Sequence, residues 1–375
     1  MPVDLDRRAD VAVVGAGIMG AAVAWRLAQR GLSVVLFEQF KLLHTRGSSH
    51  GASRIFRLAY EQVDYVLLAQ DALPLWREAE KALAQELLMT TGAVDFGPDF
   101  HLEPLARALA AAGESLERFR NSEMRARFPW IRVPEGWGAI FHERGGVLLA
   151  DACRQGLTEL ARGQGAVICD ETAVTALRVA AAGVEIETGL EEWAVSKAVI
   201  ASASWSDRLL APLDLSVPLT ITREHVGYYA ERVPSDVIPF IWHAGSASPE
   251  IYGLPNGRTG LVKIAHHGSG PVTDPDSEVS ADTRLLAPVN EFVRQTLDSL
   301  DPHPAMVETC LYATSPDDHF VIDRVGPLVL CMGFGGHGFK FAPAIGELAA
   351  KLVTDVSAVV PERFAHSRFA KRGAA

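Results

Sequence analysis

The sequence predicts a two-domain α/β protein in which a parallel-sheet domain is interrupted by a mixed α+β domain with an antiparallel sheet. Three observations predict this fold. The chain has 375 residues, which exceeds the length at which a single hydrophobic core stops growing. Residues 10–38 show a strand, a glycine-rich turn, a helix and a second strand. Two later stretches, 86–145 and 215–309, contain short strands that break this α/β alternation.

The N-terminal unit is the most regular part of the sequence. Residues 10–14 (DVAVV) form a continuous apolar run, which is typical of a parallel strand buried on both faces. The turn GAGIMG over 15–20 follows, and small and apolar residues at helical spacing predict a helix over 21–30. A second strand is predicted over 33–37 (SVVLF), with an acidic residue directly after it.

The three glycines and the acidic residue of this unit each have a chemical reason. Gly15 permits the tight turn, Gly17 lets a pyrophosphate approach the backbone, and Gly20 lets the helix and strand pack closely. The open N–H groups at the helix start bind phosphate. Glu38 is placed to accept hydrogen bonds from ribose hydroxyls. The unit therefore predicts a Rossmann-like dinucleotide site, without choosing between NAD and FAD.

The rest of the chain alternates between two kinds of pattern. A helix is predicted from Arg54 to about Gln85, another from Leu105 to Arg120, and a last one from Ala342 to Val353. Short strands are predicted at GAVDFG, GAIFHE, AVICD, VEIETG, AVSKAVIASAS, ITREHVGYYA, EIYGLP, GLVKIAHH and LVLCM. These patterns place the nucleotide-binding domain at 1–85, 146–214 and 310–375, and the second domain at 86–145 and 215–309.

Composition limits the partners and the compartment. A formal net charge of −11 without a basic run argues against nucleic-acid binding. Four cysteines without metal-ligand spacing argue against a metal site and against a disulfide scaffold. The polar start MPVDLDRRAD lacks a signal-peptide core, the terminal KRGAA is no known address, and no apolar stretch is long enough to span a membrane. A cytoplasmic protein with no membrane partner is expected.

Three segments carry a family resemblance: HTRGSSHGASRIFRLAY (44–60), ETCLYATSPDDHFVID (308–323) and GFGGHGFKFAPAIGE (333–347). The chain resembles the monomeric sarcosine oxidase and N-methyltryptophan oxidase family over nearly its whole length. Members of that family oxidise secondary amines of amino acids with a covalently bound FAD. The resemblance therefore implies FAD rather than NAD, and an FAD-binding Rossmann-like domain interrupted by a mixed α+β substrate domain.

Two arginines and a lysine are candidates for holding a carboxylate. Arg54 and Arg57 are three residues apart at the start of the predicted helix, so both are expected on one face. Arginine binds a carboxylate through two parallel hydrogen bonds, and Lys340 lies in a glycine-rich apolar segment where its charge needs a partner. The resemblance implies that Arg57 and Lys340 bind the substrate carboxylate, that Arg54 lies over the flavin, and that Cys310 forms a thioether to it.

Lys263 and His267 lie four apart on a predicted strand and therefore on one face, while His266 lies on the other. The resemblance implies that Lys263 stands beside flavin N5 and promotes the reaction with O2, since a cation stabilises developing superoxide. It places His267 near the substrate and gives Tyr252 and Tyr312 positions in the same pocket, although simple core packing remains open for both tyrosines.

Further cofactor contacts are implied in two glycine-rich segments. Ser48, Ser49 and His50 resemble the flavin-contacting loop of the family, and Gly335, Gly336 and Gly338 would bring backbone close to the flavin. The stretch from Gly47 to Gly51 also fits the G-x-S-x-G pattern of a hydrolase, but the preceding KLLHTR is no buried strand, so that interpretation is rejected.

The resulting hypothesis is a monomeric oxidase that converts sarcosine, O2 and water into glycine, formaldehyde and hydrogen peroxide by hydride transfer to flavin N5. Two departures from the family leave the substrate open. The Glu61–Asp64 loop is two residues shorter than in bacterial sarcosine oxidases and closer to the animal pipecolate-oxidising relatives, and residues 241–243 (IWH) are unusual. A larger or cyclic amine (L-pipecolate, L-proline, N-methyltryptophan), or a flavin dehydrogenase with an acceptor other than O2, is the alternative.

Overall fold

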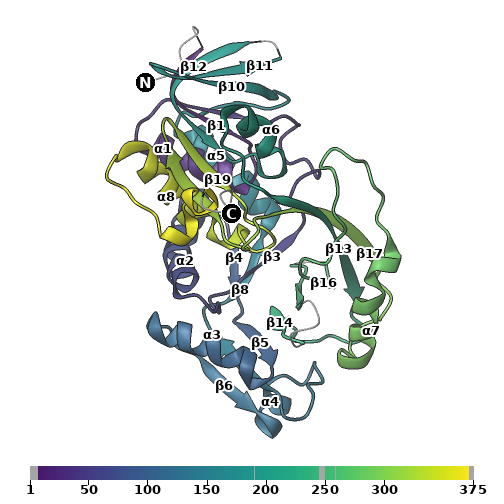
Figure 1. The fold of residues 1–375 in the computed structure, drawn as a ribbon. Coiled ribbons are helices and arrows are strands. Elements are labelled where there is room, and N and C mark those ends of the chain that lie inside the picture. Colours follow the sequence, from purple (N-terminus) through teal and green to yellow (C-terminus); the bar gives the residue numbers. More distant parts are fainter. Residues whose placement is uncertain (1–6, 190, 245–249, 258, 371–375) are drawn as a thin grey trace.

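Two eight-stranded sheets and one three-stranded sheet organise the chain. The computed structural model describes residues 7–189, 191–244, 250–257 and 259–370 (Figure 1). Residues 1–6 and 371–375, on which the expected compartment partly rests, lie outside the described residues.

The first sheet has a parallel core, in which β1 pairs with β2 and β12, β2 with β9, and β12 with β19. The hairpin partners β10, β11 and β18 join it in antiparallel fashion. Its strands are β10 (Val174–Ala180), β11 (Gly183–Thr188), β12 (Glu192–Ile200), β1 (Arg8–Val14), β2 (Val34–Phe37), β9 (Val167–Cys169), β19 (Leu328–Met332) and β18 (Val321–Val325).

Helices cover one face of this sheet, where α1 packs on both α5 and α8 (Figure 1). The four long helices on this side are α1 (Ile18–Gln29), α2 (Val63–Leu83), α5 (Ala150–Gly163) and α8 (Ala342–Thr354). Together with the sheet they enclose the largest hydrophobic cluster of the described chain. A second cluster lies on the other face, where Trp193 and Leu209 pack against Val14 and Phe37. Burial on both faces explains why β1 and β2 are continuous apolar runs.

The second sheet is antiparallel except for the parallel pair β14/β5. In spatial order its strands are β17 (Met306–Thr314), β13 (Thr220–Ala230), β16 (Leu261–His266), β15 (Ile251–Pro255), β14 (Phe240–Trp242), β5 (Ala93–Gly97), β7 (Gly138–His142) and β6 (Glu117–Arg120). The remaining α-helices are α3 (Asp99–Ala111), α4 (Asn121–Arg127), α6 (Ser206–Leu210), α7 (Ala287–Thr296) and α9 (Ser367–Ala370). Short 3₁₀ turns occur at Ala203–Trp205, Ala211–Leu213, Thr283–Leu286, Phe339–Phe341 and Glu362–Phe364.

The predicted fold class is confirmed, since a parallel-sheet unit is combined with a largely antiparallel second sheet. The N-terminal strand, turn, helix and strand also occur as expected. The domain boundaries themselves stay a prediction. The strand β17, which carries Cys310 and Tyr312, pairs with β13 across the predicted boundary at residue 310.

The helix predicted from Arg54 is wrong in its first part. Residues Ser53–Phe56 form β3, which pairs with β8 (Gly146–Leu149), and β4 (Leu88–Thr90) completes this three-stranded sheet. The helix α2 begins only at Val63. Pairing with a distant strand overrides the local helical pattern here, because β propensity depends mostly on what a segment packs against.

The helix predicted from Leu105 to Arg120 is also too long. The helix α3 ends at Ala111, and Gly113 follows with a φ of +70°, the left-handed conformation in which glycine terminates helices. Glu117–Arg120 then forms β6 at the edge of the second sheet. Gly113 is therefore a helix-termination signal within the sequence, although apolar residues at helical spacing continue beyond it.

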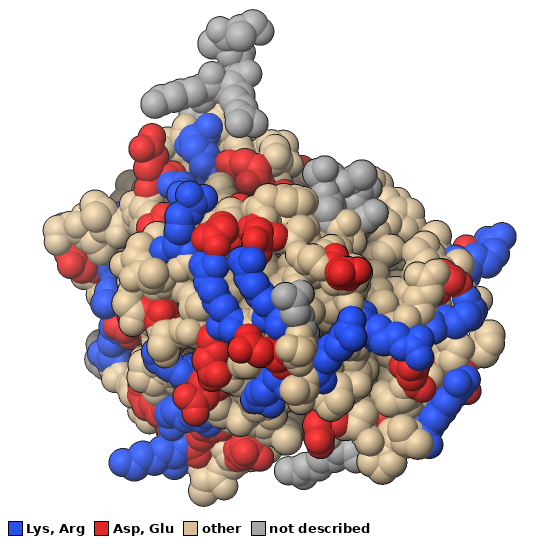
Figure 2. Space-filling model, turned by 90° about the horizontal axis from the view of Figure 1, so that it is seen from below, with Lys and Arg blue, Asp and Glu red and all other residues tan. Residues whose placement is uncertain are grey.

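The surface carries charges of both signs. Figure 2 shows Lys and Arg side chains interspersed with Asp and Glu over the face seen from below. Within the described part of the chain, no helix combines the length and the apolar character needed to cross a membrane.

Close packing at Gly20 makes a stability prediction. A Cβ atom at this position would lie 1.8 Å from the carbonyl oxygen of Gly15 and 3.4 Å from Val13 Cγ1. Gly20→Ala is expected to lower the unfolding free energy by about 1–3 kcal/mol, because the turn has to shift. Gly163→Ala is the control, since a Cβ there meets nothing within 4 Å. Thermal unfolding of both variants checks this, and an unchanged midpoint for Gly20→Ala would contradict it.

Candidate active site

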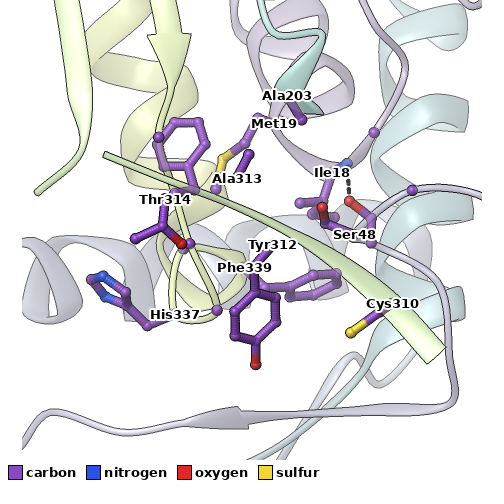
Figure 3. A pocket seen from close by; sticks show the side chains of 18 of the residues that line it. Ile18, Met19, Ser48, Ala203, Cys310, Tyr312, Ala313, Thr314, His337 and Phe339 are labelled. Atoms are coloured by element: carbon purple, nitrogen blue, oxygen red, sulfur yellow. Dashed lines mark hydrogen bonds between the residues drawn. The ribbon is translucent and has the colours of Figure 1, made fainter. Parts of the chain in front are cut away.

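One large cavity of about 1150 Å³ runs from the glycine turn after β1 to the strand β16. Every site residue predicted from the sequence lines it except Gly20, which lies under the turn. Figure 3 shows Cys310, Tyr312 and Phe339 on one side of this pocket and Ile18, Met19 and Ser48 on another. The volume exceeds the roughly 1000 Å³ at the upper end for single small-molecule sites, which leaves room for a dinucleotide and a small substrate together.

The glycine turn forms the nucleotide end of the cavity. Gly15 has a φ of +99°, and Gly17 caps α1 without a side-chain hydrogen bond. The Ile18 N–H donates to Ser49 Oγ at 3.2 Å, and a Cβ on Gly17 would lie 3.3 Å from that same oxygen (Figure 3). The backbone at the start of α1 is therefore open to a ligand, as a pyrophosphate site requires.

Glu38 lies beside this turn as an ionised carboxylate. It accepts hydrogen bonds from the N–H groups of Ala16 (2.9 Å) and Phe40 (3.0 Å). Burial raises its pKa, but the hydrogen bond from His44 and these two amides outweigh burial and lower the pKa below its ordinary value. A carboxylate has about four acceptor positions, so positions remain for ribose hydroxyls. His44, the first residue of the segment 44–60, supports this side chain, a role that was not predicted.

Arg54 is held entirely by backbone carbonyl groups. Its guanidinium donates to the carbonyl oxygens of Ser53 (2.9 Å), Ser48 (3.0 Å) and His50 (2.6 Å), and lies 5.5 Å from the Phe339 ring. Among the described residues, the hydrogen bonds of its guanidinium go to these carbonyl oxygens and to no carboxylate. Its charge is thus fixed in place and directed to the cavity, which suits a site that accumulates negative charge.

The expectation that Arg54 and Arg57 share one helix face is wrong, because Arg54 lies in the strand β3. Both arginines nevertheless line the cavity, since the strand ends at Phe56 and the chain turns before Arg57. The residues before Gly47 form no strand, and those after Gly51 enter the strand β3 rather than a helix, so the strand–turn–helix context of a hydrolase nucleophile is not formed here and the rejection of that motif is confirmed. His50 ties this loop to β17 through the carbonyl oxygens of Gly47 and Thr309.

Lys263 is a buried lysine, and its side chain points from the middle of β16 into the cavity. Its Nζ donates to the carbonyl oxygen of Ser53 at 3.3 Å. Burial, reinforced by the nearby Arg54, lowers its pKa to about 7. His267 lies just beyond the end of the same strand and lines the same cavity, while His266 faces a separate small cavity with His225.

Cys310 lies on β17, opposite Glu224 of β13, with a free thiol that lines the cavity. Burial raises the pKa of this thiol, and the two cations Arg54 and Lys263 oppose that rise. Cations beside a thiol favour the thiolate, which is the nucleophilic form. Cys310 is accordingly the cysteine of the described chain that meets the cavity, in contrast to Cys153, Cys169 and Cys331.

A tyrosine joins the two predicted carboxylate-binding cations. Lys340 Nζ donates to the hydroxyl oxygen of Tyr60 (2.8 Å) and to the carbonyl oxygen of His337 (2.6 Å). The guanidinium of Arg57 lies 4.4 Å from the centroid of the Tyr60 ring. Burial and Arg57 lower the pKa of Lys340 well below its ordinary value. Tyr60 is the last residue of the segment 44–60, and no role was predicted for it.

The remaining predicted residues complete the wall opposite the glycine turn. The ring of His267 lies 5.5 Å from that of Tyr312, and burial lowers the pKa of His267, so its imidazole is neutral near pH 7. Burial raises the pKa values of Tyr252 and Tyr312, so both hydroxyls stay protonated. A Cβ on Gly336 would lie 2.1 Å from the Tyr312 ring, so the close packing of this ring is one reason for the glycine.

Gly335 and Gly338 belong to the same turn. Gly335 has a φ of +50°, which favours glycine, and a Cβ on Gly338 would lie 2.5 Å from Cβ of Phe334. The turn therefore needs small residues for its own packing, and its backbone reaches the cavity.

Three further residues of the cavity region have no role predicted from the sequence, although His243 belongs to the unusual stretch 241–243. Asp95 on β5, His243 after β14 and Glu250 before β15 form a chain of ion pairs that reaches Arg57. They are distributed over more than one hundred residues of sequence, so no local pattern could have grouped them.

The fold and the cavity are those expected of a dinucleotide-dependent oxidoreductase, because the dinucleotide-binding sheet and the second, antiparallel sheet share one cavity. Residues 10–352 match the family of FAD dependent oxidoreductases. The chain belongs to that family, and it is an FAD-dependent oxidase.

Individual relatives extend over almost the whole chain. The peroxisomal sarcosine oxidase of Mus musculus is 34% identical over 92% of this chain and 91% of its own. The monomeric sarcosine oxidase of Arthrobacter sp. (strain TE1826) is 33% identical over 92% of both chains. The solved structure of NikD, described as an unusual amino acid oxidase essential for nikkomycin biosynthesis, has a TM-score of 0.85 at 25% identity, covering 96% of this chain and 97% of that one.

Proposed function

We propose that this protein oxidises a small N-methyl amino acid, with sarcosine as the leading substrate and O2 as the electron acceptor. The products would be glycine, formaldehyde and hydrogen peroxide. The observation that carries this proposal is the pair of buried basic side chains Arg57 and Lys340, joined by Tyr60 on the cavity wall. Lys340 makes no ion pair among the described residues, and a substrate carboxylate would supply the missing anion. The names of the relatives point to the same substrate.

The residues of the cavity divide the chemistry between them. Bound FAD supplies the two-electron acceptor for the C–N bond of the substrate. Arg57 and Lys340 bind the carboxylate and thereby orient the amine. The nitrogen must react as the free amine, because a protonated nitrogen cannot stabilise the cation that develops beside it. A neutral His267 suits this step, since it adds no positive charge to that wall of the site.

The reaction with O2 needs a cation at a different place. Reduction of O2 begins with transfer of one electron, and a fixed positive charge stabilises the superoxide that forms. Lys263 and Arg54 are the buried cations beside Cys310. We therefore assign the activation of O2 to Lys263, with Arg54 as a second fixed charge.

Release of hydrogen peroxide under air tests the function directly. We expect the highest kcat/KM for sarcosine in a panel that also contains L-pipecolate, L-proline, N-methyltryptophan and a fructosyl amino acid. Substrate-dependent reduction of an artificial dye without peroxide from any compound would instead identify a dehydrogenase. No reduction by any of the five compounds would overturn the proposal.

A larger or cyclic amine is the alternative substrate, and the short loop after Tyr60 is the reason to test it. The predicted Glu61–Asp64 loop is shorter in the structure, because α2 already begins at Val63. Glu61 and Gln62 line the cavity, whereas Asp64 lies in the first turn of α2 and pairs with Arg363 (2.9 Å). If a cyclic or bulky amine gives the highest kcat/KM, the Glu61–Asp64 loop is the element that selects it. The chemistry assigned to the other residues would stand.

Covalent attachment of the flavin through Cys310 is part of the proposal. We expect acid-precipitated wild-type protein to form a yellow pellet and Cys310→Ala to form a colourless one, because free FAD stays in the supernatant. Cys169→Ala is the matched control, since Cys169 lies on β9 and does not line the cavity. A yellow pellet from Cys310→Ala would exclude this thioether. The monomeric state and the cytoplasmic location remain predictions from the sequence.

A further inference from the structure

A chain of alternating charges runs from Arg57 to the cavity surface. Arg57 lies 3.4 Å from Asp95 Oδ1, and the same oxygen lies 3.0 Å from His243 Nε2. The other ring nitrogen of His243, Nδ1, lies 2.8 Å from Glu250 Oε1. Asp95 and His243 are buried, whereas the Glu250 side chain is 41% exposed and lines the cavity. The backbone N–H of His243 donates to Phe96 and anchors the chain on β5.

The geometry requires that His243 carries a charge. Each of its ring nitrogens faces a carboxylate oxygen, and a neutral imidazole has only one N–H donor. Both contacts are hydrogen bonds only in the imidazolium form. Burial on its own would lower the pKa of His243, but the hydrogen bonds to Asp95 and Glu250 outweigh burial and raise it to about 9. The pKa of Glu250 is lowered to about 2, since the effects of His243 and Arg57 exceed that of burial.

The four groups are balanced in charge. Arg57 and His243 supply two positive charges, and Asp95 and Glu250 supply two negative charges. If His243 lost its proton, two carboxylates would share Arg57 as their nearest cation. Arg57 would then be drawn to residues of its own protein rather than to a ligand. At separations of 2.8–3.4 Å between buried or partly buried charges, the Coulomb interaction is strong enough to decide which partner Arg57 binds.

We propose that His243 is a positioning residue that neutralises Asp95 and Glu250 and so keeps the charge of Arg57 available for the substrate carboxylate. This inference rests on the proposed function, in which Arg57 binds that carboxylate. It assigns a role in specificity to three residues that do not themselves have to touch the substrate.

Other polar groups around His243 do not supply this charge. The ring of His101 from α3 stacks on His243 with 5.6 Å between centroids. His142 on β7 is buried near Asp95, and burial lowers its pKa to about 4, so it is neutral. His267 is neutral as well, and Tyr60 stays protonated because burial raises its pKa to about 12. Besides these groups, the charged neighbours are Arg57, Asp95 and Glu250.

Binding of methoxyacetate to the holoenzyme tests the proposal. This carboxylate has the shape of sarcosine with an ether oxygen in place of the nitrogen, so the ligand does not titrate above pH 6. The dissociation constant is obtained at pH 7.5 from changes in the flavin absorbance. Three variants are compared with the wild type: His243→Gln, Glu250→Gln and the double variant.

The expected pattern follows from the charge balance. His243→Gln leaves two carboxylates for Arg57, and its dissociation constant should rise by about tenfold or more. Glu250→Gln removes a competing anion, so the constant should stay the same or fall. The double variant restores the balance and should return to within about threefold of the wild type, which is a coupling that independent effects cannot produce.

Two results would overturn the inference. If His243 served only to fill space, the double variant would bind at least as weakly as His243→Gln. If Glu250 contacted the ligand directly, Glu250→Gln alone would bind more weakly. Arg57→Met distinguishes a failure of the proposed function from a failure of the role of His243. Unchanged binding in Arg57→Met contradicts the proposed function, whereas lost binding there without the recovery in the double variant contradicts the role of His243 alone.

The pH dependence gives a second, independent readout. The raised pKa means that the imidazolium is present below about pH 9 and is lost above it. Methoxyacetate should therefore bind wild type more weakly as the pH rises from 8 to 10. The His243→Gln variant already lacks this charge, so its affinity should change less over the same range. Parallel profiles for the two proteins would contradict the proposal, because Lys340 and the flavin titrate in both.

Discussion

Lys263→Met is expected to slow the reaction of the reduced enzyme with O2 by about 10²–10³-fold, the range seen when one preorganised charge-stabilising group is removed from an active site. Lys263 is buried on β16, and among the described residues its hydrogen-bond partner is the Ser53 carbonyl oxygen. Its amino group therefore points to the cavity and, with a pKa lowered to about 7, it carries the positive charge at and below neutral pH. Methionine has a similar length and no charge, so the substitution removes the cation and preserves most of the packing.

The two half-reactions separate this effect from general damage. Anaerobic reduction by sarcosine should stay within a few-fold of the wild-type rate, and the slow step should appear only when oxygenated buffer is mixed with the reduced enzyme. Lys351→Met is the control, because Lys351 is exposed on α8 and pairs with Glu347. A stopped-flow rate of reoxidation for Lys263→Met within threefold of the wild-type rate would show that Lys263 does not activate O2.

Arg57→Met is expected to reduce kcat/KM for sarcosine by about 10²–10³-fold, mainly through KM. Removing one partner of a buried, hydrogen-bonded charge pair costs roughly 2–5 kcal/mol, and each 1.4 kcal/mol corresponds to a factor of ten. The fold should survive, since Asp95 retains His243 as a partner at 3.0 Å. Lys340 would remain as the second cation and retain part of the binding.

Arg57→Lys tests whether geometry matters beyond charge. Lysine keeps the positive charge but cannot form two parallel hydrogen bonds to a carboxylate, so its kcat/KM should lie between those of wild type and Arg57→Met. Arg178→Met, on the exposed face of β10, is the control for the loss of an arginine. Steady-state kinetics with peroxide detection measure all four proteins, and a kcat/KM for Arg57→Met within threefold of wild type would remove Arg57 from the site.

The parts of the fold that were predicted correctly depend on local chemistry. The strand β1, the turn from Gly15 to Gly20 and the helix α1 follow one another within about twenty residues. Their geometry is set by glycine conformations and by apolar periodicity, both of which are visible in the sequence. The final helix α8 was predicted for the same reason.

The incorrect predictions concern segments whose partners are distant. Ser53–Phe56 is a strand because β8, which starts at Gly146, pairs with it. The end of the second predicted helix was misplaced because Gly113 and the pairing of β6 with β7 take precedence over a continuing helical pattern. Strand pairing is decided by what a segment packs against, and that partner is absent from a local window.

The sequence by itself determined the class of cofactor site, the family, and the residues that bring charge or a thiol to the cavity: Arg54, Arg57, Lys263, Cys310 and Lys340. These residues lie in short segments, and their roles are implied by the resemblance of those segments to the family. The tertiary structure alone decided how those charges are balanced. Tyr60 meets Lys340, and Asp95 meets His243 and Arg57, because three sheets bring residues from distant parts of the chain to one cavity. The strength of a charge depends on its burial and on its neighbours, and both are properties of the folded chain.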